Sequence, residues 1–323
     1  MGSYVPSTDR ETDLSLNSNC CVCAGIVTYN PDLIRLDQNI SSIADQVDKV
    51  FVVDNGSGNV SDIVDYCESE PRVCLVRNSE NKGIAAALNQ LFVLGKDRGY
   101  SYVLTLDQDS VSMPGMVDAL FQHAGKGVGI VAPQVIDRNK EDIEDASRLL
   151  DGRVFQVAQA ARKGILTSGS LTSVQAWGYV GGFDENFFID YVDYDFNKRL
   201  LLEGYTLLRA GDAGLIHECG KATPTWLRTP RKGQDGTWSL ERFYSFGHSS
   251  FRCYYKARNR ILYSKKYKGL PGSRQFEGSV QIIPQIFLTL LFEDGKRGKL
   301  AAFLRGIHDG RKAEQPRYVL RAK

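Results

Sequence analysis

The strongest constraint on the fold is a regular alternation of short apolar runs with segments of helical spacing. The apolar runs of strand length in the first part of the chain are Val22–Thr28, Val50–Val53, Val73–Val76 and Tyr102–Leu106. Between them, apolar residues recur at helical spacing after Pro31 and again from Ile84 to Leu94. Strands that alternate with helices form a mostly parallel sheet with helices on both faces. We therefore expect an α/β fold.

Polar side chains stand where three of these strands end. The segments are Thr28-Tyr29-Asn30, Asp54-Asn55 and Asp107-Gln108-Asp109. Asn30 is also expected to cap a helix that has Pro31 at its first position. In open parallel sheets, ligands bind beyond the carboxyl ends of the strands. The pattern therefore predicts a ligand site at this edge of the sheet.

Asp107 and Asp109 are the most informative of these residues. Residues i and i+2 of a strand point to the same side, so both carboxylates can converge on one cation. Hard divalent ions such as Mg²⁺ and Mn²⁺ prefer oxygen ligands and commonly bridge phosphates. The simpler alternative is a turn, since Asp and Ser favour turns. The chain has neither G-x-G-x-x-G nor G-x-x-x-x-G-K-[ST], which argues against a dinucleotide dehydrogenase and a P-loop NTPase and favours a metal as the holder of a diphosphate.

Composition limits the class of protein. The 323 residues are 42% hydrophobic and 24% charged, with a net charge of +2. These values are ordinary for a globular protein and give no reason to expect a nucleic-acid partner. Residues 1–19 are polar and lack the regions of a signal peptide, so we expect a flexible N-terminal tail. Reduced thiols and the lack of an apolar run of membrane-spanning length predict a cytoplasmic protein.

Four sequence blocks occur in an order that is typical of one enzyme family. The blocks are Ala24–Pro31, Val52–Ser57, Asn81–Asn89 and Leu104–Ser110. They resemble inverting, GT-A-type glycosyltransferases of family 2, and most closely the bacterial rhamnosyltransferases that build O-antigen and capsule. The resemblance implies a Rossmann-like nucleotide-binding sheet with a mixed acceptor-side portion, and we assign this GT-A domain to residues 20–265. A C-terminal helical segment is expected over residues 266–323.

The resemblance implies roles for residues on the nucleotide side. Asp54 would hydrogen-bond the pyrimidine base, and Thr28 and Tyr29 would line the base pocket. Asn81 and Lys82 would lie near the nucleotide, where the Lys82 ammonium would counter the diphosphate charge. The alternatives are a turn residue at the strand end for Asp54 and a solvated residue at a helix start for Lys82.

The resemblance also implies a metal site. Asp109 would bind Mg²⁺ or Mn²⁺ directly, and Asp107 would contact the metal or the ribose. Relatives carry a histidine metal ligand at the end of a late strand, where this chain has Leu215-Ile216-His217. Without the resemblance, a histidine at a strand end is more often structural. We therefore predict that Asp107, Asp109 and His217 form the metal site.

A run of carboxylates and aromatic residues over Gly181–Arg199 resembles the block that carries the family's catalytic base. Relatives have Glu-Asp where this chain has Val192 and Asp193, so Asp193 is the predicted base and Asp190 is the second candidate. In an inverting transfer, the acceptor hydroxyl displaces the nucleoside diphosphate in one step. The base accepts the proton of that hydroxyl.

The second half of the chain contains four further segments with predicted structure. Ile165–Leu171 predicts a strand that runs into a Gly-Ser turn and a helix. Residues 218–250 predict a loop over the sugar nucleotide. Phe251–Arg260 resembles a helix that follows the catalytic core, in which Arg258 or Arg260 would contact the diphosphate or an acceptor phosphate. The alternative is a solvated basic face of this helix. The apolar segment Val280–Phe292 precedes a basic stretch, which predicts contact with the inner face of the plasma membrane. The alternative is a helix that is buried in the core or in a homodimer interface.

The predicted function is a metal-dependent inverting transfer of a sugar to a hydroxyl of a lipid-linked saccharide in the synthesis of bacterial surface polysaccharide. The favoured donor is dTDP-β-L-rhamnose. The alternatives are a GT-A transferase for another UDP- or GDP-sugar and a non-catalytic module that binds a nucleotide or a glycan. A sugar-phosphate nucleotidyltransferase would need a glycine- and Arg/Lys-rich signature after the first strand, and Thr28–Pro31 does not provide it.

Overall fold

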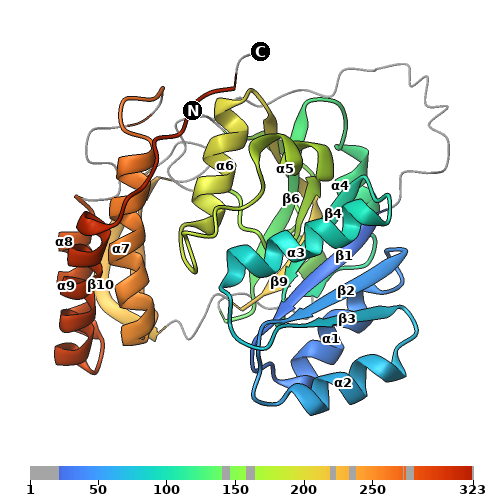
Figure 1. The fold of residues 1–323 in the computed structure, drawn as a ribbon, viewed down its shortest axis with the longest axis horizontal. Helices are drawn as coiled ribbons and strands as arrows, with labels where there is room; N and C mark the ends of the chain where they lie inside the picture. The colour runs from blue at the N-terminus through green and yellow to red at the C-terminus, as the bar shows by residue number, and fades with distance from the viewer. Residues whose placement is uncertain are drawn as a thin grey trace.

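A nine-stranded sheet forms the centre of the protein (Figure 1). The computed structural model describes residues 22–139, 146–157, 164–218, 223–232, 238–271, 273 and 280–321, and the predicted tail at 1–19 lies outside them. The strand order is β3-β2-β1-β4-β8-β6-β9-β5, and β7 pairs with β9. The strands are β1 Val22–Thr28, β2 Lys49–Asp54, β3 Val73–Arg77, β4 Tyr102–Asp107, β5 Val111–Ser112, β6 Val128–Asp137, β7 Val154–Gln156, β8 Ser170–Ser173 and β9 Thr206–His217.

The sheet has a parallel half and a mixed half. Strands β3, β2, β1 and β4 are parallel neighbours. Antiparallel pairing begins at β8, which lies between β4 and β6. Beyond it, β6 and β9 are parallel, whereas β5 and β7 run antiparallel to β9. This arrangement confirms the predicted GT-A-type sheet, with β1 to β4 as the four apolar runs of the sequence.

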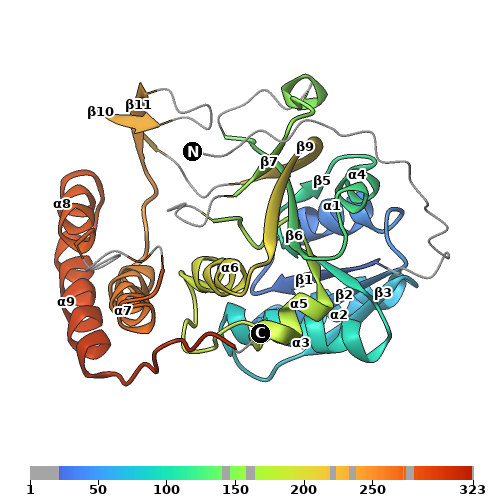
Figure 2. The same cartoon turned by 90° about the horizontal axis from the view of Figure 1, so that it is seen from above.

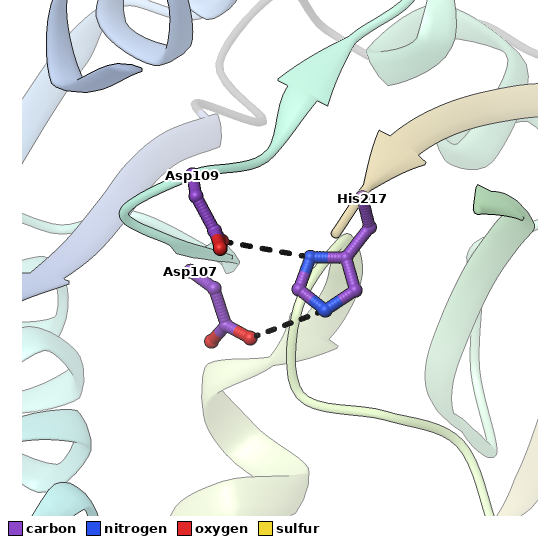
Figure 3. A group of neighbouring side chains, drawn as sticks. All are labelled: Asp107, Asp109 and His217. Carbon is purple, nitrogen blue, oxygen red and sulfur yellow. Dashed lines mark ion pairs between the residues drawn. The ribbon is translucent and has the colours of Figure 1, made fainter. Parts of the chain in front are cut away.

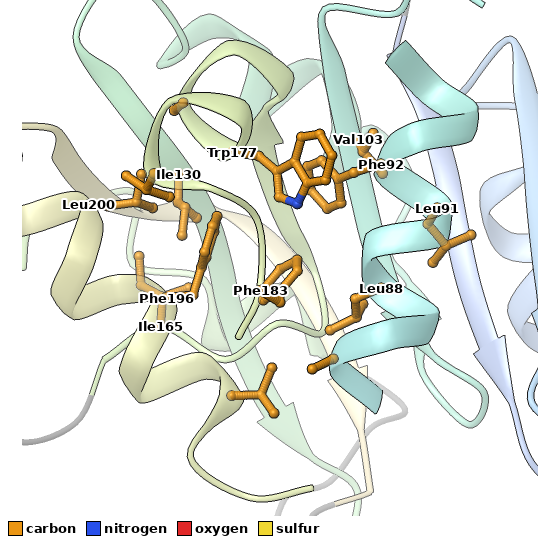
Figure 4. Close-up of a cluster of buried hydrophobic side chains, with 14 of the residues drawn as sticks. Leu88, Leu91, Phe92, Val103, Ile130, Ile165, Trp177, Phe183, Phe196 and Leu200 are labelled. Carbon is orange, nitrogen blue, oxygen red and sulfur yellow. The ribbon is translucent and has the colours of Figure 1, made fainter. Parts of the chain in front are cut away.

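Helices cover both faces of the sheet (Figures 1 and 2). The helices are α1 Leu33–Ile43, α2 Val60–Ser69, α3 Ile84–Asp97, α4 Met116–Gln122, α5 Val174–Val180 and α6 Val192–Leu202. Apolar side chains of α1, α2 and α4 form one core with the sheet, and those of α3, α5 and α6 form the other. In the second core, Phe92 stacks on Trp177 with ring centroids 5.2 Å apart, and Phe183 packs on Phe196 (Figure 4). This core fixes the position of α6.

Two local predictions from the sequence are wrong. Helix α1 is capped by Asp32, whose carboxylate accepts two backbone N–H groups, and not by Asn30. Asn30 has a φ of 49°, and its side chain accepts the N–H of Gly58 instead. The strand predicted within Ile165–Leu171 forms only after the turn, as β8, because Gly169 has a φ of 80° and reverses the chain first.

The C-terminal part forms a helical layer beside the sheet (Figure 2), with α7 Ser250–Lys266, α8 Ile282–Phe292 and α9 Lys296–Lys312. Helix α9 lies closely along α7, since a Cβ atom on Gly306 would lie 2.3 Å from the carbonyl oxygen of Tyr254. The predicted loop over the sugar nucleotide is wrong for its described part, which forms the antiparallel strands β10 Thr223–Lys232 and β11 Trp238–Ser245. None of the described helices is long and apolar enough to cross a membrane.

Candidate active site

Asp107, Asp109 and His217 meet at one edge of the sheet (Figure 3). Asp107 is the last residue of β4, Asp109 lies in the turn that follows, and His217 is the last residue of β9. The short strand β5 follows this turn and pairs antiparallel with the end of β9, where Ser112 lies opposite Leu215. This pairing brings the end of β9 back to the Asp-x-Asp turn, although the two are far apart in sequence.

The three side chains have the geometry to hold one cation. Nε2 of His217 lies 3.8 Å from Oδ2 of Asp107, and Nδ1 lies 3.7 Å from Oδ1 of Asp109. One ligand atom of each residue lies within 4.8 Å of the others. Burial raises the pKa of Asp109, and the charge of Asp107 adds to the rise, so added positive charge would stabilise the pair. Two carboxylates and an imidazole fit a divalent cation such as Mg²⁺ or Mn²⁺.

Two buried serines support this group. Oγ of Ser110 lies 3.0 Å from Nδ1 of His217 and 2.8 Å from Oγ of Ser168. Oγ of Ser168 also accepts the N–H of Asp107 at 3.0 Å. Metal-binding histidines commonly use their second ring nitrogen for a contact of this kind, which leaves Nε2 of His217 to face a cation. Sequence reasoning missed both serines, although Ser110 directly follows the Asp-x-Asp motif.

Asp54 and Thr28 are buried where β1 and β2 end. Oδ1 of Asp54 accepts the hydroxyls of Thr28, at 3.0 Å, and of Ser57, while Oδ2 accepts the N–H of Ser57 at 3.1 Å. Asp54 and Thr28 are both 0% exposed, whereas Tyr29 is 49% exposed and its N–H donates to Oε1 of Gln108. Asp54 and Thr28 therefore shape the loops at the sheet edge, and their contact with a base stays a prediction.

Side-chain amides hold the loop between β3 and α3. Nδ2 of Asn55 donates to Oδ1 of Asn81 at 3.0 Å, and Oδ1 of Asn55 accepts the N–H of Lys82 at 3.1 Å. Oδ1 of Asn81 also accepts the N–H of Gly83 at 2.9 Å. The Lys82 side chain is exposed, and its ammonium has no hydrogen bond or ion pair within the described part of the chain. Asn81 thus shapes the loop, and Lys82 is available to a ligand.

A strained turn precedes α6 and the predicted base. Asp190 and Tyr191 have φ values of 63° and 70°, which residues other than glycine rarely adopt. The buried Asn259 of α7 holds this turn, because its Nδ2 donates to the carbonyls of Ile189 at 2.8 Å and of Asp190 at 3.0 Å. Asp193 then lies in the first turn of α6. Strained backbone of this kind clusters at functional sites, where the surrounding structure holds it in place.

The carboxyl group of Asp193 has no cationic partner among the residues that the structure describes. Its Oδ1 accepts the N–H of Tyr194 at 2.8 Å, and the side chain lines a small cavity with Thr105 of β4. Burial raises the pKa of Asp193 to about 6. The hydrogen bond from Tyr194 lowers this pKa, and the negative charge of Asp190 raises it further. Such a carboxylate is ionised at neutral pH and accepts a proton more readily than an ordinary aspartate.

The second candidate base, Asp190, forms an ion pair. Nη2 of Arg252, in α7, lies 2.7 Å from Oδ1 of Asp190. Burial lowers the pKa of Arg252. The hydrogen bond to Asp190 and the negative charges of nearby site carboxylates outweigh this effect and raise the pKa overall. Arg258, an arginine predicted from the sequence, donates to the carbonyl of Asn186 at 2.8 Å. Arg252 therefore contacts a site carboxylate where Arg258 contacts a backbone carbonyl, and sequence reasoning missed Arg252.

The fold and the site define a class of protein. A GT-A-type sheet carries a candidate divalent-cation site at one edge, as expected of a glycosyltransferase that uses a nucleotide sugar. Residues 23–176 match the family model described as Glycosyl transferase family 2. This match spans all four sequence blocks and supports the prediction made from them.

Individual proteins support the same family and fold. The chain is 28% identical over 262 residues to dTDP-rhamnosyl transferase RfbF of Shigella flexneri, and the match covers 78% of this chain and 81% of that protein. S. aureus TarS 1-349 in complex with UDP-GlcNAc has a TM-score of 0.52 and 12% identity, with 90% of this chain and 80% of that one covered. GalNAc-T7 with UDP, GalNAc and Mn²⁺ has a TM-score of 0.50 and 12% identity; 85% of this chain is covered, but only 58% of that one. At these identities the two structures support the fold alone.

Proposed function

We propose that the protein is a metal-dependent inverting glycosyltransferase that moves L-rhamnose from dTDP-β-L-rhamnose to a hydroxyl of a lipid-linked saccharide. The transfer would serve the synthesis of a bacterial surface polysaccharide such as O-antigen. The observation that carries the proposal is the convergence of Asp107, Asp109 and His217 at one edge of a GT-A-type sheet. The similarity to a protein named dTDP-rhamnosyl transferase supports the choice of donor.

Asp107, Asp109 and His217 would hold Mg²⁺ or Mn²⁺. When bound, the cation offsets the negative charge that develops on the leaving nucleoside diphosphate, so that no protein acid is required. Ser110 orients the imidazole of His217 through Nδ1. Lys82 is exposed at the loop before α3, and its ammonium would add positive charge beside the phosphates.

Asp193 would act as the general base. It would accept the proton of the acceptor hydroxyl while that oxygen bonds to the anomeric carbon and the bond from this carbon to the diphosphate oxygen breaks. A single displacement of this kind inverts the configuration. Asp190 is less suited to the role, because its carboxylate is already paired with Arg252 at 2.7 Å. Arg252 would instead contact a phosphate of the donor or acceptor, the role that the sequence suggested for Arg258.

The nucleotide would lie over the ends of β1 and β2. Tyr29 offers an exposed ring to the base. Both oxygens of Asp54 accept hydrogen bonds from Ser57, and one also accepts the Thr28 hydroxyl, so a base would have to share or replace one of these bonds. Asn81 would stabilise the loop that contains Lys82 and would not contact the nucleotide itself.

The C-terminal helices would contact the surface of an anionic membrane, where a lipid-linked acceptor is found. One face of α8 exposes apolar side chains at i, i+4 and i+8: Ile283 at 75%, Phe287 at 65% and Leu291 at 43%. The following helix α9 exposes the basic side chains Lys296, Arg297, Arg305, Arg311 and Lys312. An apolar helix face beside basic residues binds at the interface of bilayers that contain anionic lipids. A homodimer through α8 is the competing outcome.

Calorimetric titration of a panel of donors tests this function. dTDP-rhamnose, UDP-glucose and GDP-mannose are each titrated with Mg²⁺ and then with EDTA. We expect dTDP-rhamnose to bind with metal and to lose most of its affinity in EDTA. Preference for another nucleotide sugar would contradict the rhamnose assignment and keep the transferase. Binding of no donor would contradict the transferase itself and favour a module that binds glycans.

A further inference from the structure

A cavity of about 650 Å³ lies beside the proposed catalytic centre, on the mixed half of the sheet. Ile165 and Leu166 separate it from the small cavity that Asp193 lines, since they line both. Ser168, whose hydroxyl accepts the N–H of Asp107, lines the cavity on the side of the metal-site residues. Its other lining residues come from β6, β7, β9 and their adjoining segments, and none comes from β1 or β2. The cavity is therefore placed for the acceptor and not for the nucleotide.

Arg209 of β9 lines this cavity without a carboxylate partner in the described part of the chain. The side chain is partly buried, and its Nη2 donates to the backbone carbonyl of Gly164 at 3.1 Å. Burial lowers the pKa of Arg209, and no carboxylate of the described residues offsets that effect. A guanidinium that is withdrawn from water without a counter-ion is unfavourable unless a ligand supplies one.

The other charged groups of the cavity neutralise each other. Nη2 and Nε of Arg153 donate to Oδ2 of Asp151 at 2.7 and 3.0 Å. The guanidinium of Arg153 also lies 5.2 Å from the ring centroid of Phe155. The strand register places Phe155 directly opposite Arg209, with Ala132 of β6 on the other side. Among its described lining residues, the cavity therefore has one unmatched positive charge next to an aromatic ring.

The geometry points to a site in which Arg209 binds an anionic group of the acceptor, either a carboxylate or a phosphate. A guanidinium presents parallel N–H groups that match both anions. Phe155 supplies an apolar surface beside that charge, as is common in pockets for small organic molecules. The assignment of the ligand to the acceptor rests on the proposed transferase function.

Ligand-observed NMR tests this site on the full chain in EDTA, so that phosphate cannot bind through a metal. The probes are sodium glucuronate, inorganic phosphate and the neutral methyl glucoside. They are titrated into the wild type, Arg209→Gln, Arg209→Lys and the control Arg98→Gln. Arg98 is an exposed arginine that lies over Phe51, away from the cavity.

We expect at least one anion to bind the wild type about tenfold more tightly than methyl glucoside, a difference of about 1.4 kcal/mol. Arg209→Gln should remove this difference, Arg209→Lys should keep part of it, and Arg98→Gln should leave it unchanged. Preference for glucuronate would assign a carboxylate, and preference for phosphate would assign a phosphate. Equal anion affinities for the wild type and Arg209→Gln, or no anion binding to the wild type, would overturn the proposal.

Binding of dTDP is measured on the same variants in a buffer with Mg²⁺ and without EDTA. A bound anion that dTDP displaces would place the cavity on the donor side and overturn the proposal. Absence of dTDP binding to the wild type would contradict the proposed function. The anion titrations would still show whether Arg209 forms an anion site. If Arg209→Gln also loses dTDP binding, a second measurement is made by NMR on the wild type with isotope-labelled arginine. The Nε–H signal of Arg209 is identified as the one that is missing in Arg209→Lys. We expect this signal to shift when the anion is added, and an unchanged signal would overturn the proposal.

Discussion

Nη2 of Arg252 lies 2.7 Å from Oδ1 of Asp190. This ion pair distinguishes Asp190 from Asp193, the two carboxylates that the sequence leaves as candidates for the catalytic base. Asp193 has no such partner among the described residues. It lines a cavity shared with Thr105 of β4, and burial raises its pKa to about 6. Asp193 is therefore the carboxylate that is suited to accept a proton.

Asp193→Asn should lower kcat by roughly 10²- to 10⁴-fold, because the amide cannot accept the proton of the acceptor hydroxyl. The affinity for dTDP-rhamnose, measured by calorimetry, should stay close to that of the wild type. Asp118→Asn is the matched control, since Asp118 also lies in the first turn of a helix but is exposed on α4. Full turnover in Asp193→Asn, measured as dTDP release, would show that another residue is the base.

The pKa of Asp193 sets the expected pH dependence. The base must be ionised, and this form is lost as the pH falls through the pKa of about 6. The rate of dTDP release should therefore rise with pH, reach half of its plateau at about that value, and level off at higher pH. The residual rate of Asp193→Asn should lack this rise. A rise centred near pH 4, the ordinary pKa of an aspartate at about 3.9, would contradict a buried base.

Ser110→Ala should weaken the binding of the divalent cation by about 10- to 100-fold, because it removes the contact that orients His217 through Nδ1. Ser112→Ala is the matched control. Ser112 is buried close by, and its hydroxyl has no hydrogen-bond partner among the described residues. Mn²⁺ titration of both variants compares their affinities. Equal affinities would show that Ser110 does not position the histidine.

Strands β1 to β4 and the pair Asp107 and Asp109 were predictable from the sequence because they depend on local patterns. The predicted strand Val22–Thr28, which is apolar up to its final threonine, forms β1 with the same bounds. Asp107 and Asp109 follow directly from the end of a buried strand. His217 has no local signal beyond the end of a strand, and it was found only through the family resemblance.

The missed features depend on contacts between distant segments. Ser168 contacts Ser110 because the chain turns after it and β8 pairs antiparallel with β4. The sequence around Ser168 contains no pattern that predicts this pairing. The choice between Asn30 and Asp32 as helix cap is settled by the N–H of Gly58, which binds Asn30 from another loop. Strands β10 and β11 likewise form only through their pairing with each other. A segment rich in Arg, Thr and aromatic residues is compatible with an exposed two-stranded ribbon as well as with a loop, so its composition does not distinguish the two.

Asn259→Ala should lower the free energy of unfolding by about 1–3 kcal/mol, because the carbonyls of Ile189 and Asp190 lose their buried donor. It should also lower kcat, since the strained turn would no longer hold the start of α6. Urea denaturation and dTDP release measure the two effects. Asn186→Ala, at an exposed asparagine, should change stability by no more than about 0.5 kcal/mol. A variant as stable and active as the wild type would contradict the role of Asn259.

Phe287→Ser should weaken binding to vesicles that contain phosphatidylglycerol, because Phe287 is 65% exposed on the apolar face of α8. Co-sedimentation with these vesicles, and with neutral phosphatidylcholine vesicles for comparison, measures the effect. Val93→Ser, at an exposed apolar residue of α3, should bind as the wild type does. A wild-type dimer that Phe287→Ser dissociates, without any vesicle binding, would assign this face to a second copy of the chain.

We infer that Asp107, Asp109 and His217 hold the divalent cation that binds the diphosphate of the donor. Electron paramagnetic resonance of Mn²⁺, titrated with the protein in the presence and absence of dTDP, tests this inference most directly. We expect a single bound Mn²⁺ whose affinity rises when dTDP is added, and a loss of this binding in both Asp109→Asn and His217→Ala. Variants that bind Mn²⁺ and dTDP as tightly as the wild type would contradict it.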